Sequence, residues 1–435
     1  MDTRRTVAQL RRLMRWLEAF NECFGHRAQR LALRRYVQGL LSDSARKSMD
    51  AMLARVTEPG SYQAFQHFIT DSPWRADQVW RRLREVLPER EGLLIIDGTS
   101  FPKQGNYSVG VGRQYCGALG KVANCQVAVT AALWTGLRGY LLGAALYLPE
   151  AWLTDAARAR ARIPTSVRFQ EKWRQALTLL RQVRASGITV TGVLADAEFG
   201  DTGLFRAMLH RARLPYAVGI SSTQKVFPGR PHLVWPQGRR HGRPRTHPAL
   251  EAGVQSATVA AIAAAQPRWR RISWRNRGAA RRWTVECVAL RVTPAHDWRQ
   301  HRQLAPEVWL VGERDVGDTP QTKYFFVHLP ATASWTRLVR FAHQRWAIEQ
   351  QYRELKTNLG LDHFEGRTFP GWHHHVVLTA ITYNFLQAER RRHLAGLTFP
   401  AAHAIVQEIF TAYLFAQRPH YLKRIEALQS VQLRI

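Results

Sequence analysis

The chain has 435 residues, of which 46% are hydrophobic, and this length and apolar content indicate a globular, folded protein of two or three domains. Lysine and arginine number 63 against 32 aspartates and glutamates, a formal net charge of +31, which predicts a polyanionic partner, with nucleic acid the first candidate. The four cysteines form no Cys-x-x-Cys pair and no apolar run approaches the ~18 residues of a membrane span, which excludes a zinc knuckle, a disulfide framework and an integral membrane protein. We therefore expect a soluble, cytoplasmic protein.

The first 88 residues show only helical periodicity, with Leu10, Leu17 and other apolar residues on one face and arginines facing away. Further helices are predicted at Arg27–Leu41, Ala45–Arg55 and Ala76–Leu87. We interpret residues 1–88 as a helical N-terminal DNA-binding region. A charged face exposed only to solvent explains the arginines nearly as well, since no helix-turn-helix signature is present.

The stretch Leu93–Ile96 is apolar and partly β-branched, which predicts a strand buried on both faces, and Asp97 is expected to stand at its end. A buried carboxylate usually has a cation or hydrogen-bond donors beside it, although a simple turn at Asp97 is an equal alternative. Further strands, predicted to follow as an antiparallel meander, are Ser108–Tyr115, Asn124–Trp134 and Arg138–Leu148.

A second strand repeats the pattern of the first. After a helix that includes Trp173 and Val183, the apolar strand Thr189–Ala195 is predicted to deliver Asp196 at its end. Another helix and the strand Tyr216–Ile220 complete a strand-helix-strand unit. Residues 89–220 are therefore predicted to form the first part of an α/β core.

Between residues 221 and 330 the composition changes. Residues 228–248 are rich in Pro, Gly, Arg and His and are predicted to form a long loop. The predicted strands are Arg268–Arg275, Arg282–Val292, Glu307–Val311 and Lys323–Val327. We interpret the segment as a β-strand insertion domain, whose alternating Arg and Trp suit a nucleic-acid surface or an ordinary sheet with an arginine-rich outer face.

The segment Trp335–Gly360 is predicted to be one helix, because apolar residues recur in it at helical spacing. Beside that stripe runs a charged face in which one carboxylate is flanked by cations, and salt bridges within the helix explain this pattern as readily as a function does. The face consists of Arg345, Glu349, Arg353 and Lys356.

The remaining residues to 435 are predicted to be helical, including Val376–Leu386 and Phe399–Gln417, so that residues 331–435 complete the core. The run His373-His374-His375 is more typical of a polar helix start than of a metal site, because adjacent helical residues point in different directions.

Two carboxylates at strand ends and one on a later helix, in a basic protein, are suited to hold two hard divalent cations against a phosphodiester. The candidates are Asp97, Asp196 and Glu349. The order of the predicted strands and helices is that of the ribonuclease H-like fold. We therefore predict an α/β protein with a ribonuclease H-like catalytic core, a β-rich insertion, an all-α N-terminal region and C-terminal helices.

The residues around these carboxylates resemble the DDE transposases of the IS701 insertion-sequence family, within the wider IS4-like group. Three separated motifs occur in the expected order, and the resemblance extends from the N-terminal helices to Arg367. The motifs are Ile96–Gly105 with Arg113–Lys121, Leu194–Asp196, and Arg345–Lys356. The resemblance implies that Asp97, Asp196 and Glu349 form the metal-binding triad, with Mg²⁺ or Mn²⁺ as the cofactor and two ions in each active site.

The same resemblance implies contacts with double-stranded DNA, and a location in the bacterial cytoplasm in association with the nucleoid. Arg345, Glu349 and Lys356 match the last three members of the family's Tyr-Arg-Glu-Lys signature, whereas Ala342 stands where its tyrosine is expected. We expect Arg345 and Lys356 to act on DNA rather than on the fold. The full set of expected DNA contacts is Arg345, Arg353, Lys356, Lys103, Arg113 and Lys121.

The function predicted from the sequence is that of a transposase, which cleaves the ends of an insertion sequence and joins them to target DNA by two-metal phosphoryl transfer. Its partners would be the terminal inverted repeats and target DNA, bound by a homodimer or higher oligomer. Two alternatives remain: a ribonuclease H-like nuclease without strand transfer, and a domesticated DNA-binding regulator that no longer cuts. The presence of all three carboxylates argues against the regulator.

Overall fold

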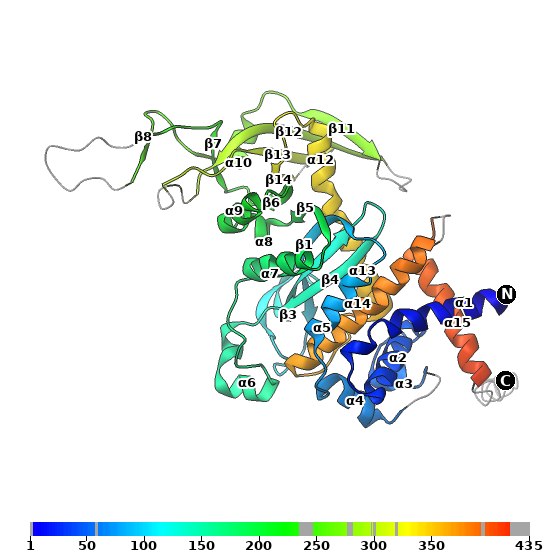
Figure 1. Ribbon diagram of the computed structural model, residues 1–435. Coiled ribbons are helices and arrows are strands. Elements are labelled where there is room, and N and C mark those ends of the chain that lie inside the picture. The colour runs from blue at the N-terminus through cyan, green and yellow to red at the C-terminus, as the bar shows by residue number, and fades with distance from the viewer. Residues whose placement is uncertain are drawn as a thin grey trace, which may run out of the picture.

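The computed structural model describes residues 3–56, 60–234, 247–275, 282–296, 298, 302–317, 321–392 and 396–417. It is a mixed α/β protein in which one large mixed sheet extends across the molecule, while helices from both ends of the chain pack together beside it (Figure 1). No helix within those ranges combines the length and the apolar character needed to cross a membrane.

Helices from the beginning of the chain pack in a layer against the later helix α14 (Phe369–Arg392). They are α1 (Thr3–Glu18), η1 (Asn21–Cys23), α2 (Arg27–Leu41), α3 (Met49–Leu53), α4 (Tyr62–Thr70) and α5 (Ala76–Glu85). The helix predicted from Ala45 begins only at Met49, because the Ser48 hydroxyl accepts a hydrogen bond from an amide of the first turn and caps the helix there.

The centre of the sheet has the strand order β4-β3-β1-β5-β6. These strands are β1 (Glu91–Pro102), β3 (Lys121–Trp134), β4 (Gly139–Leu146), β5 (Thr189–Ala195) and β6 (Tyr216–Ile220). Strand β1 is antiparallel to β3 and parallel to β5, and β5 is parallel to β6. The parallel pairs bring the carboxyl ends of β1 and β5 to the same side of the molecule.

Side chains of β1 alternate between the two faces of the sheet. Leu94 and Ile96 pack in the apolar cluster that includes helix α7 (Lys172–Ala185), whereas Ile95 packs in the cluster that includes Ile348. By this alternation, Asp97 lies on the same face as Ile95.

The predicted antiparallel meander is wrong in one respect. Strand β2 (Gly112–Cys116) does not lie between β1 and β3 but pairs with the first residues of β3. Cys125 pairs with Pro102 of β1 on one side and with Gly112 of β2 on the other, so β2 and β4 lie along the same edge of β3. Strand β3 is long enough to pair with both.

The connection from β4 to β6 is mainly helical. Its elements, besides α7, are η2 (Glu150–Leu153), α6 (Asp155–Ala161), α8 (Ala197–Gly200) and α9 (Gly203–Arg211). Helix α7 closes at Gly187, whose φ of 75° is the left-handed conformation that ends helices readily at glycine. The predicted strand-helix-strand order around Asp196 is therefore present.

The strand-rich segment after β6 continues the same sheet, because β14 (Thr322–His328) pairs with β6 (Figure 1). All four strands predicted from the sequence are present, although residues 235–246 of the predicted long loop lie outside the described residues. The other elements are β7 (Lys225–Pro228), β8 (Leu233–Val234), β9 (Ala249–Leu250), β10 (Ala257–Thr258), α10 (Val259–Ala264), β11 (Arg270–Arg275), β12 (Arg282–Pro294) and β13 (Val308–Asp315).

The single helix predicted over Trp335–Gly360 is interrupted. Helix α12 (Trp335–His343) ends in the 3₁₀ turn η3 (Gln344–Trp346), and α13 (Ala347–Leu359) follows. The two helices meet different surfaces, since α12 packs on the strand-rich segment while the later turns of α13 join the cluster around α14. The 3₁₀ turn lies between these two packing sites.

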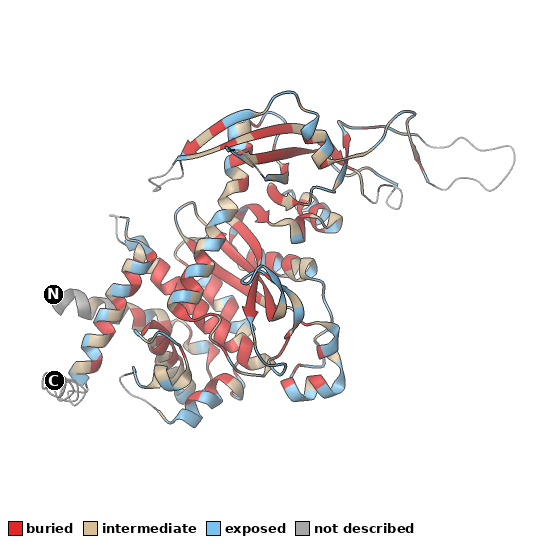
Figure 2. Ribbon diagram, turned by 180° about the vertical axis from the view of Figure 1, so that it is seen from behind, coloured by how far each residue is buried: buried red, intermediate tan, exposed pale blue. Residues whose placement is uncertain are grey.

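Helix α14 passes through the core and is mostly buried (Figure 2), and α15 (Phe399–Gln417) packs against it. The prediction that the histidine run is a polar helix start is wrong. The His374 ring lies between the carbonyl oxygens of Ile69 and Trp74, at 2.8 and 2.9 Å, and His375 Nδ1 lies 2.8 Å from the Tyr36 hydroxyl. These buried rings connect α14 to the N-terminal helices.

Candidate active site

Asp97 lies within β1, and the prediction that it ends its strand is wrong. Pairing with β5 stops at Ile96, but pairing with β3 continues to Pro102 and keeps β1 extended. Asp97 therefore stands where the neighbouring strand β5 turns away, with its side chain 10% exposed. The edge of β1 that faces β5 is therefore unpaired by β5 beyond Ile96, next to the buried carboxylate of Asp97.

Asp196 directly follows β5, as predicted, and Ala195 pairs with Ile96 of β1. The residues before the two aspartates are thus partners in a parallel ladder, and both carboxylates lie at the same end of neighbouring strands. Asp196 also caps the short helix α8, since its Oδ1 accepts a hydrogen bond from Glu198 N at 3.1 Å. The cap fixes the position of the carboxylate relative to the strand end.

Glu349 lies in the first turn of α13, and Arg345 lies in the preceding 3₁₀ turn. The Arg345 guanidinium donates to Glu349 Oε1 at 3.0 Å and to Asp97 Oδ2 at 3.4 Å. The side chain of Glu349 is half-exposed. Arg345 therefore connects the helix that carries the third carboxylate to the strand that carries the first.

The charged side chains around Asp97 carry more negative than positive charge. Burial raises the pKa of Asp97 above its ordinary value, and the charges of Asp196 and Glu349 raise it further, against the opposing effect of Arg345. Burial also raises the pKa of Asp196. A group whose charged form is disfavoured in this way gains from an added cation.

Sequence reasoning missed a hydroxyl pair beside Asp97. Thr130 of β3 is the register partner of Asp97 and donates to its carbonyl oxygen at 3.4 Å. Tyr352 of α13 lies with its hydroxyl 2.6 Å from Thr130 Oγ1. Burial raises the pKa of Tyr352 well above its ordinary value, and the charge of Asp97 adds to this effect. In the sequence, the sign that Tyr352 lies near the site is that it follows Glu349 by three residues on the predicted helix.

Glu198 is a further acidic side chain that was not singled out. A Cβ atom at Gly98 would come within 3.2 Å of Glu198 Oε2, so this carboxylate approaches the backbone next to Asp97. Its other contact is an ion pair with Lys172 of α7. Its place two residues after Asp196 was the only sign in the sequence.

The expected DNA-contacting cations are divided between two kinds of position. Lys356 and Lys103 are half-buried and donate to the carbonyl oxygens of Ser100 and Phe364 respectively. Burial lowers the pKa of both amines. These two lysines therefore support the chain around the end of β1.

Apart from Arg345, the other expected cations are exposed. Arg353 lies on the outer face of α13, Arg113 lies on β2, and Lys121 lies at the start of β3. They lie on three different elements, rather than forming one row on a single helix.

The structure brings Asp97 and Asp196 together and links Glu349 to them through Arg345. Across the described ranges, no three His, Cys, Asp or Glu side chains converge closely enough to hold a metal ion. The cation that lies between Asp97 and Glu349 is the Arg345 guanidinium.

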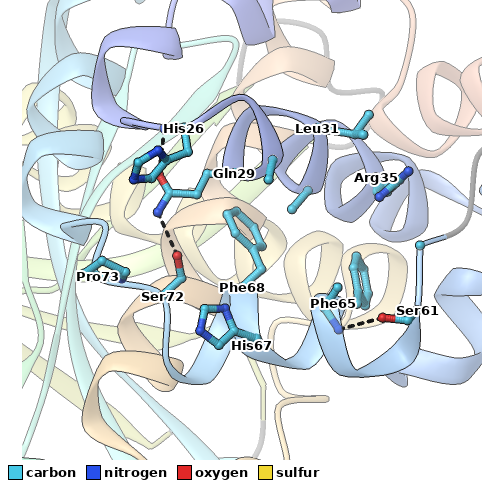
Figure 3. Close-up of a pocket in the computed structure, with 14 residues that line it drawn as sticks. His26, Gln29, Leu31, Arg35, Ser61, Phe65, His67, Phe68, Ser72 and Pro73 are labelled. Carbon is cyan, nitrogen blue, oxygen red and sulfur yellow. Dashed lines mark hydrogen bonds between the residues drawn. The ribbon is translucent and has the colours of Figure 1, made fainter.

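A separate hollow of about 400 Å³ lies between α2 and α4, among the N-terminal helices (Figure 3). Figure 3 shows Gln29 directed at Ser72, to which it donates at 2.8 Å, with the Phe68 ring beside them. Its described lining includes none of the predicted catalytic residues, so it is distinct from the candidate active site.

A family model described as DDE superfamily endonuclease matches residues 19–281, which is more than half of the chain. This chain belongs to the DDE superfamily endonucleases. The match includes Asp97 and Asp196 and ends before α13, so that Glu349 lies outside it.

This DDE superfamily endonuclease is similar to the probable transposase for insertion sequence element IS701 of Microchaete diplosiphon, with 32% identity over 194 residues. The aligned part is 43% of this chain and 48% of the relative, so the chain spans about half the length of that relative. The finding confirms the resemblance predicted from the motifs. Among solved structures, the chain is similar to the piggyBac transposase in its synaptic complex with hairpin DNA, with a TM-score of 0.43, 9% identity, and coverage of 91% of this chain and 73% of that one.

Proposed function

We propose that this DDE superfamily endonuclease is a transposase, which binds the ends of an insertion sequence, cleaves them and joins them to target DNA by phosphoryl transfer. The observation that carries the proposal is the placement of Asp97 and Asp196 at neighbouring positions of parallel strands, with Glu349 connected to them by Arg345. A set of carboxylates at one sheet edge, in a chain of net charge +31, suits chemistry on a nucleic-acid phosphodiester.

We further propose that residues 89–220 and α13 form a ribonuclease H-like core. The strand order β4-β3-β1-β5-β6 supports this, with antiparallel pairing among the first three strands and parallel pairing from β1 onward. In this assignment residues 1–88 bind DNA, residues 221–330 extend the sheet as the strand insertion, and residues 331–435 complete the core.

The donor set fits hard divalent cations, because Asp97, Asp196 and Glu349 offer only oxygen ligands and because the pKa of Asp97 is raised by burial and by its carboxylate neighbours. We propose that these three residues hold two Mg²⁺ or Mn²⁺ ions. When bound, such ions supply a lowered pKa for the attacking hydroxyl and charge stabilisation for the leaving oxygen.

The remaining groups of the site orient the DNA and the carboxylates. Arg345 has five N–H donors in a planar fork, which suits bidentate donation to a phosphate beside Asp97 and Glu349. Tyr352 and Thr130 hold the backbone of Asp97 in place through their hydrogen bonds. The DNA on either side of the cleaved bond would meet cations of the surrounding elements, namely Arg353, Lys356, Lys103, Arg113 and Lys121.

A nuclease without strand transfer would use the same residues, because hydrolysis and joining differ only in whether water or a 3′-hydroxyl attacks. The presence of all three carboxylates, Asp97, Asp196 and Glu349, argues against a regulator that no longer cuts.

The test is an assay of cleavage and joining on end-labelled duplexes that carry the inverted repeats flanking the reading frame, with supercoiled plasmid as the target. In Mg²⁺ the wild-type chain is expected to cleave and join, whereas Asp97→Asn, Asp196→Asn and Glu349→Gln bind DNA but do neither. Glu354→Gln is the matched control, because this buried carboxylate of α13 contacts Gln350 and Tyr383 instead.

The assay also separates the alternatives. Cleavage without joined products would identify the nuclease. Tight binding with no cleavage in either Mg²⁺ or Mn²⁺ would identify the regulator and remove the proposed function.

A further inference from the structure

The β2–β3 ribbon, defined as residues 112–125, exposes large apolar side chains. Tyr115 is 64% exposed, Leu119 49% and Val122 53%. Tyr115 and Val122 are direct partners in the antiparallel ladder and therefore lie on one face of the ribbon, while Leu119 lies in the turn. Apolar groups concentrated on a short exposed ribbon mark a binding surface rather than a contribution to the core.

The turn of the ribbon is anchored to the catalytic strand. Ser100 Oγ accepts a hydrogen bond from Ala118 N at 3.0 Å, and Cys116 Sγ lies 3.4 Å from the same oxygen. The carbonyl oxygen of Ser100 accepts a hydrogen bond from Lys356 of α13 at 2.9 Å. The anchor thus joins the ribbon to the two elements that carry Asp97 and Glu349.

The anchor also fixes how far the ribbon is from the site. Ser100 is three residues beyond Asp97 on an extended strand, which corresponds to about 10 Å. A DNA duplex is wider than this distance, so a duplex with a phosphate at Asp97 can extend past the end of β1 toward the ribbon. Arg113 and Lys121 are exposed on the same ribbon and provide cations for its phosphates.

We propose that the β2–β3 ribbon acts as a wedge, which inserts Tyr115, Leu119 and Val122 into the duplex held at the candidate active site and unstacks base pairs beside the bond to be cleaved. The proposal rests on the DNA-cleaving function proposed above. The occupant is the DNA end itself, because the ribbon combines apolar side chains, which bind unstacked base faces, with the cations Arg113 and Lys121 along its length, which bind phosphates.

A wedge affects the opening of the duplex and not the chemical step. Opening costs free energy only when the bases are paired, so the contribution of the wedge should disappear on DNA that is already unpaired at that position. This difference separates a wedge from a ribbon that only increases affinity.

The test compares Leu119→Ala and the double variant Tyr115→Ala, Val122→Ala with the wild-type chain. Leu137→Ala is the matched control, because Leu137 is a 39% exposed apolar residue in the turn at the opposite end of β3. Each protein is given a fully paired end and the same end with three mismatched pairs at the cleavage position. We expect the ribbon variants to cleave the paired end at least about tenfold more slowly and the mismatched end within about twofold of wild type.

A second measurement observes opening without cleavage. With 2-aminopurine at the cleavage position and Ca²⁺ in place of Mg²⁺, the wild-type chain and Leu137→Ala should increase the fluorescence, and the ribbon variants should not. A wild-type chain that opens the DNA but never cuts in Mg²⁺ would refute the proposed cleavage and support the wedge.

Three outcomes would overturn the wedge. One is equal loss of cleavage on paired and mismatched ends, and another is no loss on either. The third is a change in the mass of the DNA-free protein in light scattering for the ribbon variants, which would make the ribbon an interface between two copies of the chain.

Discussion

The hydroxyl of Tyr352 lies 2.6 Å from Thr130 Oγ1, and Thr130 is the residue of β3 that pairs with Asp97. Because the Thr130 hydroxyl donates to the carbonyl oxygen of Asp97, Tyr352 is the donor to Thr130. Helix α13 is therefore connected to the backbone of the first candidate metal ligand through two hydroxyl groups.

Tyr352→Phe is expected to reduce the rate of DNA cleavage by about tenfold or more, since small displacements of catalytic groups have large effects on rate. The free energy of unfolding should fall by only about 1 kcal/mol, the usual loss for one hydrogen bond. Tyr383→Phe is the control, because the buried Tyr383 hydroxyl bonds to Glu354 and Gln387 away from the site. Equal rates for the two variants per folded molecule would make Tyr352 purely structural.

Asp97→Asn is expected to raise the melting temperature of the protein in EDTA at pH 8 while abolishing cleavage. The folded-state pKa of Asp97 is raised, so its charged form opposes folding above that pKa, and the neutral amide removes this cost. Asp71→Asn should give no such gain, because the exposed Asp71 is ion-paired with Arg162. A lower melting temperature for Asp97→Asn would mean that the contact with Arg345 outweighs the burial of the charge.

Lys356→Ala is expected to lower the free energy of unfolding by about 1–3 kcal/mol, because it leaves the Ser100 carbonyl without its charged donor. This result would revise the expectation that Lys356 acts on DNA alone. Arg353→Ala, on the exposed face of the same helix, should change stability by less than about 0.5 kcal/mol. Urea unfolding of both variants measures the difference, and equal stabilities would leave Lys356 without a structural role.

Acid should weaken the packing of α14 against the N-terminal helices. Burial lowers the pKa of His375 to about 4, whereas an unfolded histidine titrates near 6.5. The contribution of neutral His375 to the free energy of unfolding is therefore fully present above about pH 6.5. It is lost as the pH falls toward 4, and the free energy of unfolding then decreases by up to about 1.4 kcal/mol per pH unit for this residue. Urea unfolding between pH 7 and 5 should show a smaller pH slope for His375→Gln and an unchanged slope for the exposed His67→Gln. An unchanged slope for His375→Gln would exclude this histidine as the cause.

The affinity for duplex DNA is expected to fall by at least about tenfold between 50 and 200 mM salt, because a chain of net charge +31 displaces condensed counterions. Lys121→Ala should reduce the slope of log affinity against log salt by about 1, the effect of one phosphate contact. Arg75→Ala should not, since Arg75 is ion-paired with Asp77. A flat plot for the wild-type chain would mean that its charge serves a partner other than DNA.

The features that the sequence predicted correctly are local ones. The apolar strand before Asp196 and the helix that carries Glu349 follow from hydrophobic periodicity, which needs no knowledge of distant contacts. Strand β6 has the predicted bounds for the same reason. The strand ends and the charged helix face indicated the three candidate carboxylates, the family resemblance implied their role as a triad, and their catalytic roles stay predictions.

The features that it missed depend on pairing between distant segments. The link from Tyr352 to Thr130 requires the register of β3 against β1, which no periodicity encodes. The break at Gln344 depends on two packing surfaces that lie far apart in the sequence. The histidines of α14 are buried because carbonyls and hydroxyls of the N-terminal helices meet their rings, whereas the sequence shows only three polar residues in a row.

Strand β14 pairs with one edge of β6, although it follows β6 in the chain by about a hundred residues. This pairing can therefore form only after β14 has been synthesised. Until residues 322–328 leave the ribosome, one edge of β6 lacks its native partner, and such an edge is prone to pair with other chains. The helix with Glu349 emerges later still. A chain truncated before β14 would thus carry both aspartates, lack the glutamate, and be liable to aggregate.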